Sequence, residues 1–138
     1  MSGVFEFGYR NSSDLIVEGD VGDSFGIMME SGKVTVRGDS DLNLAHTMKD
    51  GEIEVEGDVE GIWNPSGRVV VQGDVESAYQ IEGELIVKGD IDEISGDDRF
   101  EREGEIRVEG EIGSVNEEEI EGTEVYQNQN GNWEQVFP

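Results

Sequence analysis

The stretch GEIEVEGDV, residues 51–59, decides the fold, because close copies of its first eight residues occur five more times along the chain. Each copy reads glycine, any residue, an aliphatic residue, any residue, valine, any residue, glycine and an acid, except that a serine opens the first. The copies are SDLIVEGD (13–20), GKVTVRGD (32–39), GEIEVEGD (51–58), GRVVVQGD (67–74), GELIVKGD (83–90) and GEIRVEGE (104–111). Their second glycines lie 16 to 21 residues apart. A repeat of this length buries its apolar side only by stacking on its neighbours, so it predicts a β-solenoid.

Three positions of each repeat are expected to fill the interior of the coil. Two aliphatic positions of the phrase are separated by one residue, which places both on one face of a strand. The third position, directly after the acid, is aliphatic in every copy except one, where Ser40 makes the core weakest. The three columns are Leu15, Val34, Ile53, Val69, Leu85 and Ile106; Val17, Val36, Val55, Val71, Val87 and Val108; and Val21, Ser40, Val59, Val75, Ile91 and Ile112. Mostly large side chains four residues before each following phrase are expected to close the core along a second side: Met28, Thr47, Trp63, Tyr79 and Phe100.

The outward positions give an independent prediction of register, because equivalent residues of stacked rungs lie about 4.8 Å apart. Two charged columns flank the phrase: Asp14, Lys33, Glu52, Arg68, Glu84 and Glu105; and Glu18, Arg37, Glu56, Gln72, Lys88 and Glu109. Seven of the ten stacked neighbours are opposite in charge and only Glu84 and Glu105 are alike, which favours parallel, in-register stacking. The column between them offers a candidate apolar contact at Ile16, Val70 and Ile86.

The last position of the phrase is acidic in every copy and forms a candidate interaction stripe of Asp20, Asp39, Asp58, Asp74, Asp90 and Glu111. The positions that follow add Asp41, Glu60, Glu76 and Asp92. One explanation is local, since a carboxylate after glycine accepts backbone N–H groups in a turn. The other is a stripe that binds cations or basic side chains.

The charge balance restricts the partners. The chain of 138 residues has 34 acids and nine bases, a net charge of −25, which disfavours direct contact with nucleic acid or an anionic membrane. Three interpretations of the acidity stay open: solubility in a high-salt cytoplasm, a basic protein partner, and imitation of nucleic acid. No long apolar run and no secretory pattern precede the repeats, so we expect a cytoplasmic protein.

Both ends of a solenoid need a cover, because an open end pairs with other chains. Residues 1–12 are predicted to form an N-terminal cap on the repeats of residues 13–122. Residues 123–138 are predicted to form a C-terminal β-hairpin around Asn130-Gly131, a pair typical of type I′ turns, with Trp133 and Phe137 covering the last rung. Alternatively, this tail reaches a second copy of the protein.

The sequence predicts no enzyme. His46 is the only histidine and cysteine is absent, so neither a nucleophile with its base nor a His or Cys metal site can be assembled. Pairs of carboxylates occur everywhere in so acidic a chain and point to no particular reaction. We therefore predict no catalytic, cofactor-binding or metal-binding residue.

Residues 15–59 resemble the GXGXG β-helix family, which includes the C-terminal domain of the glutamate synthase large subunit and one of the subunits of formylmethanofuran dehydrogenase. The resemblance rests on Gly-Asp-Val-Gly-Asp at 19–23, a methionine three residues before Gly32 and Gly51, and the glycine-flanked strand. It implies a right-handed β-helix in a structural role. The shorter rungs after residue 60 are more similar to bactofilins, which are polymerising cytoskeletal β-helices.

Together these patterns predict one all-β domain, a single right-handed parallel β-helix of about six rungs with a C-terminal hairpin cap. We expect a non-catalytic acidic scaffold or assembly module that contacts a protein partner or a second copy of itself. The alternatives are an acidic decoy or nucleic-acid mimic that binds a basic protein, and a polymerising bactofilin-like element.

Overall fold

The computed structural model describes residues 15–20, 32–41, 49–63, 65–96, 104–116 and 123–137. These residues form strands and no helix, so the described part of the chain contains no helix that could cross a membrane. The strands are β1 (Leu15–Val17), β2 (Lys33–Val36), β3 (Glu52–Val55), β4 (Val59–Trp63), β5 (Arg68–Val71), β6 (Val75–Tyr79), β7 (Glu84–Val87), β8 (Ile91–Ser95), β9 (Glu105–Val108), β10 (Ile112–Val115), β11 (Glu124–Gln129) and β12 (Asn132–Phe137).

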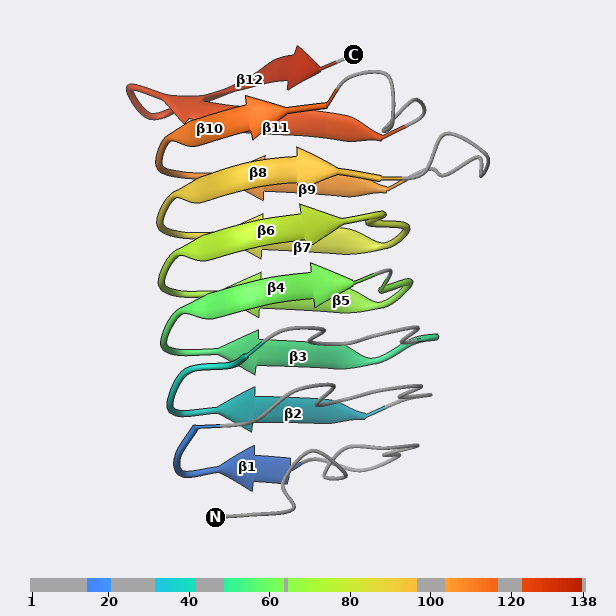
Figure 1. Ribbon diagram of the computed structural model, residues 1–138, viewed down its shortest axis with the longest axis vertical. Coiled ribbons are helices and arrows are strands. Elements are labelled where there is room, and N and C mark those ends of the chain that lie inside the picture. Colours follow the sequence, from blue (N-terminus) through green and yellow to red (C-terminus); the bar gives the residue numbers. More distant parts are fainter. Residues whose placement is uncertain are drawn as a thin grey trace.

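The strands stack into two parallel sheets that wind as a right-handed coil (Figure 1). The eight-stranded sheet has the order β1-β2-β3-β5-β7-β9-β11-β12, and the four-stranded sheet has the order β10-β8-β6-β4. All pairs are parallel except β11 with β12. The solenoid prediction is thus confirmed, but the rung count differs. The described residues contain four turns with a strand in both sheets, whereas the eight-stranded sheet stacks seven parallel strands.

The core columns lie where the repeat places them. In β2, β3, β5, β7 and β9 every residue of the first two columns is fully buried. In the third column Val59, Val75 and Ile91 are buried, whereas Ile112 on the terminal strand β10 is half-buried. Ser40 is buried as well, and its backbone continues the ladder by a bridge to Val59. Val21 lies outside the described residues.

The second side of the core corrects the sequence prediction. Trp63 is 41% exposed and Tyr79 is half-buried, so these rings do not close the interior. A column of smaller residues fills it instead: Ile62, Ala78 and Ile94, which are aligned on β4, β6 and β8 and are all buried. Trp63 and Tyr79 stack on each other outside, with ring centroids 4.5 Å apart. Met28, Thr47 and Phe100 lie outside the described residues.

The C-terminal hairpin is confirmed. Asn130 and Gly131 both have positive φ, 56° and 89°, as a type I′ turn requires. Phe137 is buried against the core, but Trp133 is 39% exposed and does not cover the last rung. The sequence also did not reveal that β11 is itself a further rung, because it pairs in parallel with β9 and buries Val125 beside Ile106.

Candidate functional site

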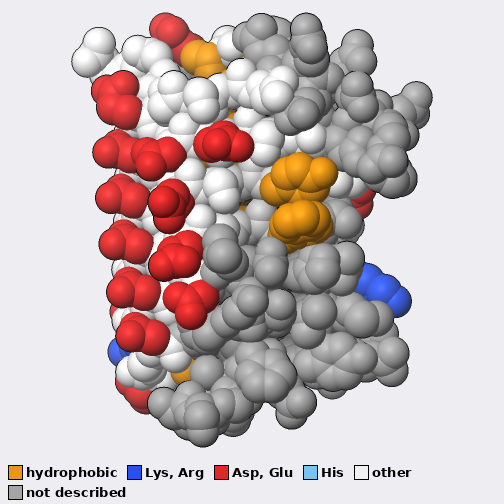
Figure 2. Space-filling model, in the orientation of Figure 1, with side chains coloured by type: hydrophobic (Ala, Val, Ile, Leu, Met, Phe, Trp, Pro, Cys, Tyr) orange, Lys and Arg blue, Asp and Glu red, His pale blue; other side chains and the backbone are white. Residues whose placement is uncertain are grey.

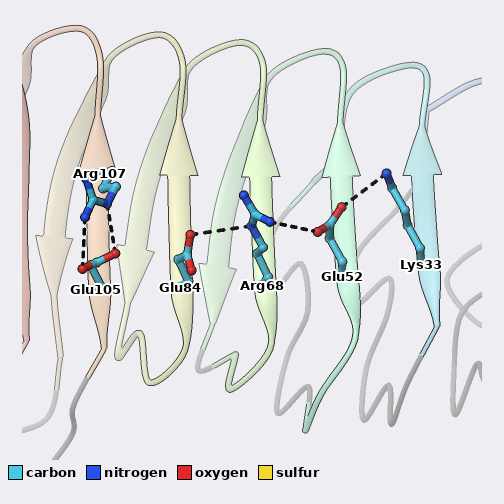
Figure 3. A network of polar contacts seen from close by, with 6 residues as sticks. All are labelled: Lys33, Glu52, Arg68, Glu84, Glu105 and Arg107. Carbon is cyan, nitrogen blue, oxygen red and sulfur yellow. Dashed lines mark hydrogen bonds and ion pairs between the residues drawn. The ribbon is translucent and has the colours of Figure 1, made fainter.

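The outer face of the eight-stranded sheet carries the two charged columns in the predicted register, and Figure 3 shows the first of them from Lys33 to Glu105. Glu52 forms ion pairs with Lys33 at 3.4 Å and with Arg68 at 3.5 Å, and Arg68 forms a second ion pair with Glu84 at 3.6 Å. The second column adds the pairs Arg37–Glu56 at 3.6 Å and Lys88–Glu109 at 3.2 Å. The side chains are exposed or half-buried, so each pair stabilises the fold little, and the main effect of the pairs is to exclude shifted registers. Asp14 lies outside the described residues.

The first column has two like-charged steps, because Glu105 is aligned with Glu84 on β7 and with Glu124 on β11. Glu105 stacks on Glu84 but forms its ion pair with Arg107 of the same strand, at 3.0 Å. The hydrogen bond to Glu105 is the main reason why the pKa of Arg107 is raised. The Arg107 guanidinium also lies 4.8 Å from the ring centroid of Tyr126 and 5.6 Å from that of Trp133. Sequence reasoning missed this aromatic cluster, although a seventh phrase beginning at Thr123 would have aligned Tyr126 with Arg107.

The candidate apolar contact runs along the middle of the same face. Register pairs connect Ile16, Thr35, Glu54, Val70, Ile86, Arg107 and Tyr126 in one column. Val70 and Ile86 are direct neighbours and half-buried, whereas Ile16 lies at the other end of the column and is 55% exposed. The structure therefore brings two of the three predicted residues together and leaves Ile16 apart from them.

The acidic stripe is a ladder of hydrogen bonds along the corner between the two sheets. Oδ1 of each aspartate accepts the backbone N–H of the acid one rung further on, at 2.8 Å in all five steps. The prediction that these carboxylates accept backbone N–H groups is confirmed, but the donor belongs to the next rung and not to the same turn. The residues joined in this way are Asp20, Asp39, Asp58, Asp74, Asp90 and Glu111.

The ladder explains the glycine before each acid. A Cβ on Gly73 would meet Oδ1 of Asp58 and would lie 2.6 Å from the carbonyl oxygen of Gly57. The same conflict arises at Gly38, Gly57, Gly89 and Gly110. Each of these glycines after Gly38 also donates its N–H to the carbonyl of the glycine below. At the end of the series Nε2 of Gln127 bonds to the Gly110 carbonyl at 2.9 Å and takes the place of a next glycine.

A second acidic column runs beside the ladder, at the start of the four-stranded sheet. Its members Asp41, Glu60, Glu76 and Asp92 are exposed, and Glu60 and Glu76 occupy equivalent positions in the register of β4 and β6. None of the strands β4, β6, β8 and β10 contains lysine or arginine. Figure 2 shows the result on this side of the molecule, where acidic side chains stand in columns along the coil. Unlike the face with the ion pairs, this face presents negative charge that no cation of its own strands neutralises.

No reaction is indicated by these arrangements. In the described ranges, no group of three or more His, Cys, Asp or Glu side chains is placed to hold a metal ion. His46 lies outside the described residues. The described residues thus present two different surfaces, one charge-paired with an apolar centre and one acidic.

No protein-family model matches this chain, and no curated protein matches it. The resemblance to the GXGXG β-helix family, and the weaker one to bactofilins, therefore stay predictions.

Proposed function

We propose that this protein is a non-catalytic scaffold that acts in the cytoplasm through contacts with other protein chains. One observation carries the proposal: the outer face of the eight-stranded sheet is charge-paired and apolar at its centre, in a chain whose net charge is −25. Val70 and Ile86 lie side by side there, with Arg68 and Lys88 in the neighbouring columns.

The physical reason is the cost of desolvation. A partner that covers Val70 and Ile86 removes apolar surface from water, and the flanking ion pairs already neutralise part of the local charge. The same partner placed on the four-stranded sheet would have to cover unpaired carboxylates, which is costly unless the partner is basic. The charge-paired face thus favours a partner with an apolar surface, whereas the acidic face favours a basic partner.

The test is the double substitution Val70→Asp and Ile86→Asp. Its matched control is Ser77→Asp with Ser114→Asp, which adds the same charge to the four-stranded sheet. We expect the first variant to weaken association, measured by size-exclusion chromatography with light scattering and by capture of partners from the native cell extract, while the control retains it. Association that is unchanged in the first variant would exclude this face.

A second candidate function is supported by the acidic columns, namely binding of a basic protein as a decoy or nucleic-acid mimic. The column of Glu60, Glu76 and Asp92 allows a clean test, because these exposed side chains are not part of the hydrogen-bond ladder. The variant Glu60→Gln, Glu76→Gln, Asp92→Asn should lose salt-sensitive binding to a basic DNA-binding protein and keep its fold. Binding that does not weaken with added salt argues against this function.

The third expectation, a polymerising element similar to bactofilins, predicts a mass that grows without limit as the concentration rises. Light scattering over a wide concentration range separates such growth from a closed assembly of fixed size.

A further inference from the structure

The last strand of the eight-stranded sheet, β12, has a neighbour on only one side. It pairs with β11 and stands at the end of the strand order. Its residues Asn132 to Val136 are exposed, and two of them, Trp133 at 39% and Val136 at 42%, are large hydrophobic residues. Figure 1 shows β12 lying across the C-terminal end of the coil. An edge strand of this length with apolar side chains is a surface that pairs readily with another strand.

The C-terminal residues 125–138 carry much less charge than the remaining chain. Residues 125–138, VYQNQNGNWEQVFP, contain a single charged side chain, Glu134. At the opposite end of the sheet, by contrast, two acids, Glu18 and Asp20, come shortly after β1. Two copies of a chain with a net charge of −25 repel each other over most of their surfaces. The C-terminal hairpin is where two such copies approach each other with the least repulsion.

We propose that β12 pairs with β12 of a second copy, antiparallel and across a two-fold axis, so that two solenoids join end to end through one continuous sheet. The proposal rests on the function proposed above, because it names the partner of one contact of the scaffold. Pairing of one edge with the same edge of a second copy is self-complementary. The assembly therefore closes at a dimer and does not grow into a filament.

The charges and the shape of the β12 edge indicate that its partner is a second copy of this chain. A basic partner would find no acidic surface on β12, and a head-to-tail neighbour would bring the hairpin against the acids that follow β1. A second β12 strand brings only Glu134 as a charged residue, and antiparallel pairing centred on Gln135 keeps the two Glu134 side chains off opposite positions. In the dimer the exposed side of Val136 is covered by the partner strand.

The first experiment compares Val136→Asp with Asn130→Asp in the full-length chain by sedimentation equilibrium, in low salt and in multimolar KCl. Both variants add one negative charge to the hairpin, but Asn130 lies at the turn, where aspartate tolerates the positive φ. We expect a dimer for the parent chain, strengthened by KCl, a dissociation constant at least about tenfold higher for Val136→Asp, and less than about a threefold change for Asn130→Asp. Far-ultraviolet circular dichroism should show that both variants remain folded.

Crosslinking gives a second, independent measurement, since the chain contains no cysteine. Gln135→Cys should form an intermolecular disulfide on mild oxidation, and Ser77→Cys on the four-stranded sheet should not. A parent chain that is monomeric in both salts, equal effects of the two aspartates, or equal crosslinking at both sites would overturn the β12 pairing. A dimer lost only in the Val70→Asp, Ile86→Asp variant would also overturn it, while leaving the proposed scaffold function intact.

Discussion

Replacement of Gly73 by alanine tests the corner ladder most directly. The new Cβ would meet Oδ1 of Asp58 and would lie 2.6 Å from the carbonyl oxygen and 2.9 Å from the carbonyl carbon of Gly57. Two of these atoms belong to the backbone of the rung below, so the clash cannot be relieved by rotation of a side chain. The carboxylate of Asp58 must then move away from the N–H of Asp74, to which it is bonded at 2.8 Å.

The magnitude follows from these two effects. Forcing an extra methyl group into a packed site costs about 1–3 kcal/mol, and loss of a hydrogen bond to a charged group costs about 1.5–3 kcal/mol. Asp58 is exposed, which favours the lower end of the second range. We expect Gly73→Ala to lower the free energy of unfolding by about 2.5–4.5 kcal/mol, or the melting temperature by about 9–15 °C for a chain of this size.

The chain offers a matched control at the same position of the phrase. Among the described residues, no atom lies within 4 Å of the place that a Cβ on Gly19 would occupy. Alanine there should be neutral or stabilise by about 0.4–1 kcal/mol, because it reduces the freedom of the unfolded chain. Urea unfolding followed by circular dichroism measures both variants. Equal effects of Gly73→Ala and Gly19→Ala would refute the ladder as the reason for the second glycine of the repeated phrase.

Three further outcomes are expected. Asp58→Ala should destabilise the fold by about 1–2 kcal/mol in urea unfolding and Asp58→Asn by less, since the amide oxygen still accepts the N–H of Asp74, whereas Glu76→Gln should be neutral or slightly stabilising. Thr123→Val should raise the melting temperature, because the buried Thr123 Oγ1 has no hydrogen-bond partner among the described residues; a lower value would contradict this. Burial, followed by the charge of Glu124, raises the pKa of Tyr126 above its ordinary value of 10.0. The folded state therefore holds this proton longer than the unfolded state, and stability should fall as the pH rises above about 10. Phenolate absorbance assigned with Tyr126→Phe checks the shift, and ionisation of Tyr126 below pH 10 would refute it.

The core and the register were predictable because both depend on local rules that repeat. A spacing of two sets the face of a strand, and six copies with alternating charges leave one good alignment. The side of the coil opposite the phrase was not predictable in the same way. In β4 the alternation breaks, since Gly61 and Ile62 are both buried, and this step turns Trp63 outward.

Other features depend on contacts between rungs that no single repeat displays. The acid after each second glycine suggested a bond to a backbone N–H, but only stacking shows that the donor lies 16 to 21 residues further on. The seventh rung was hidden because Thr123 stands in place of its first glycine and Gln127 in place of its valine. The structure explains the glutamine at position 127, because its side-chain amide donates a hydrogen bond to the Gly110 carbonyl, the last in the series of glycine carbonyls.

The glycine-aspartate corner also bears on how such a chain changes its length. Every rung from Gly57 to Glu111 is attached at this corner by the same two bonds, whether the arc that returns to it has 16 or 21 residues. The bonds at the corner are therefore the same for every coil, whatever the number of residues between one corner and the next. Duplication of the segment 67–82 would add one coil that presents matching glycine and aspartate partners to both neighbours and lengthens the molecule by about 4.8 Å. Insertion of a whole coil is thus the simplest way to lengthen this protein by engineering.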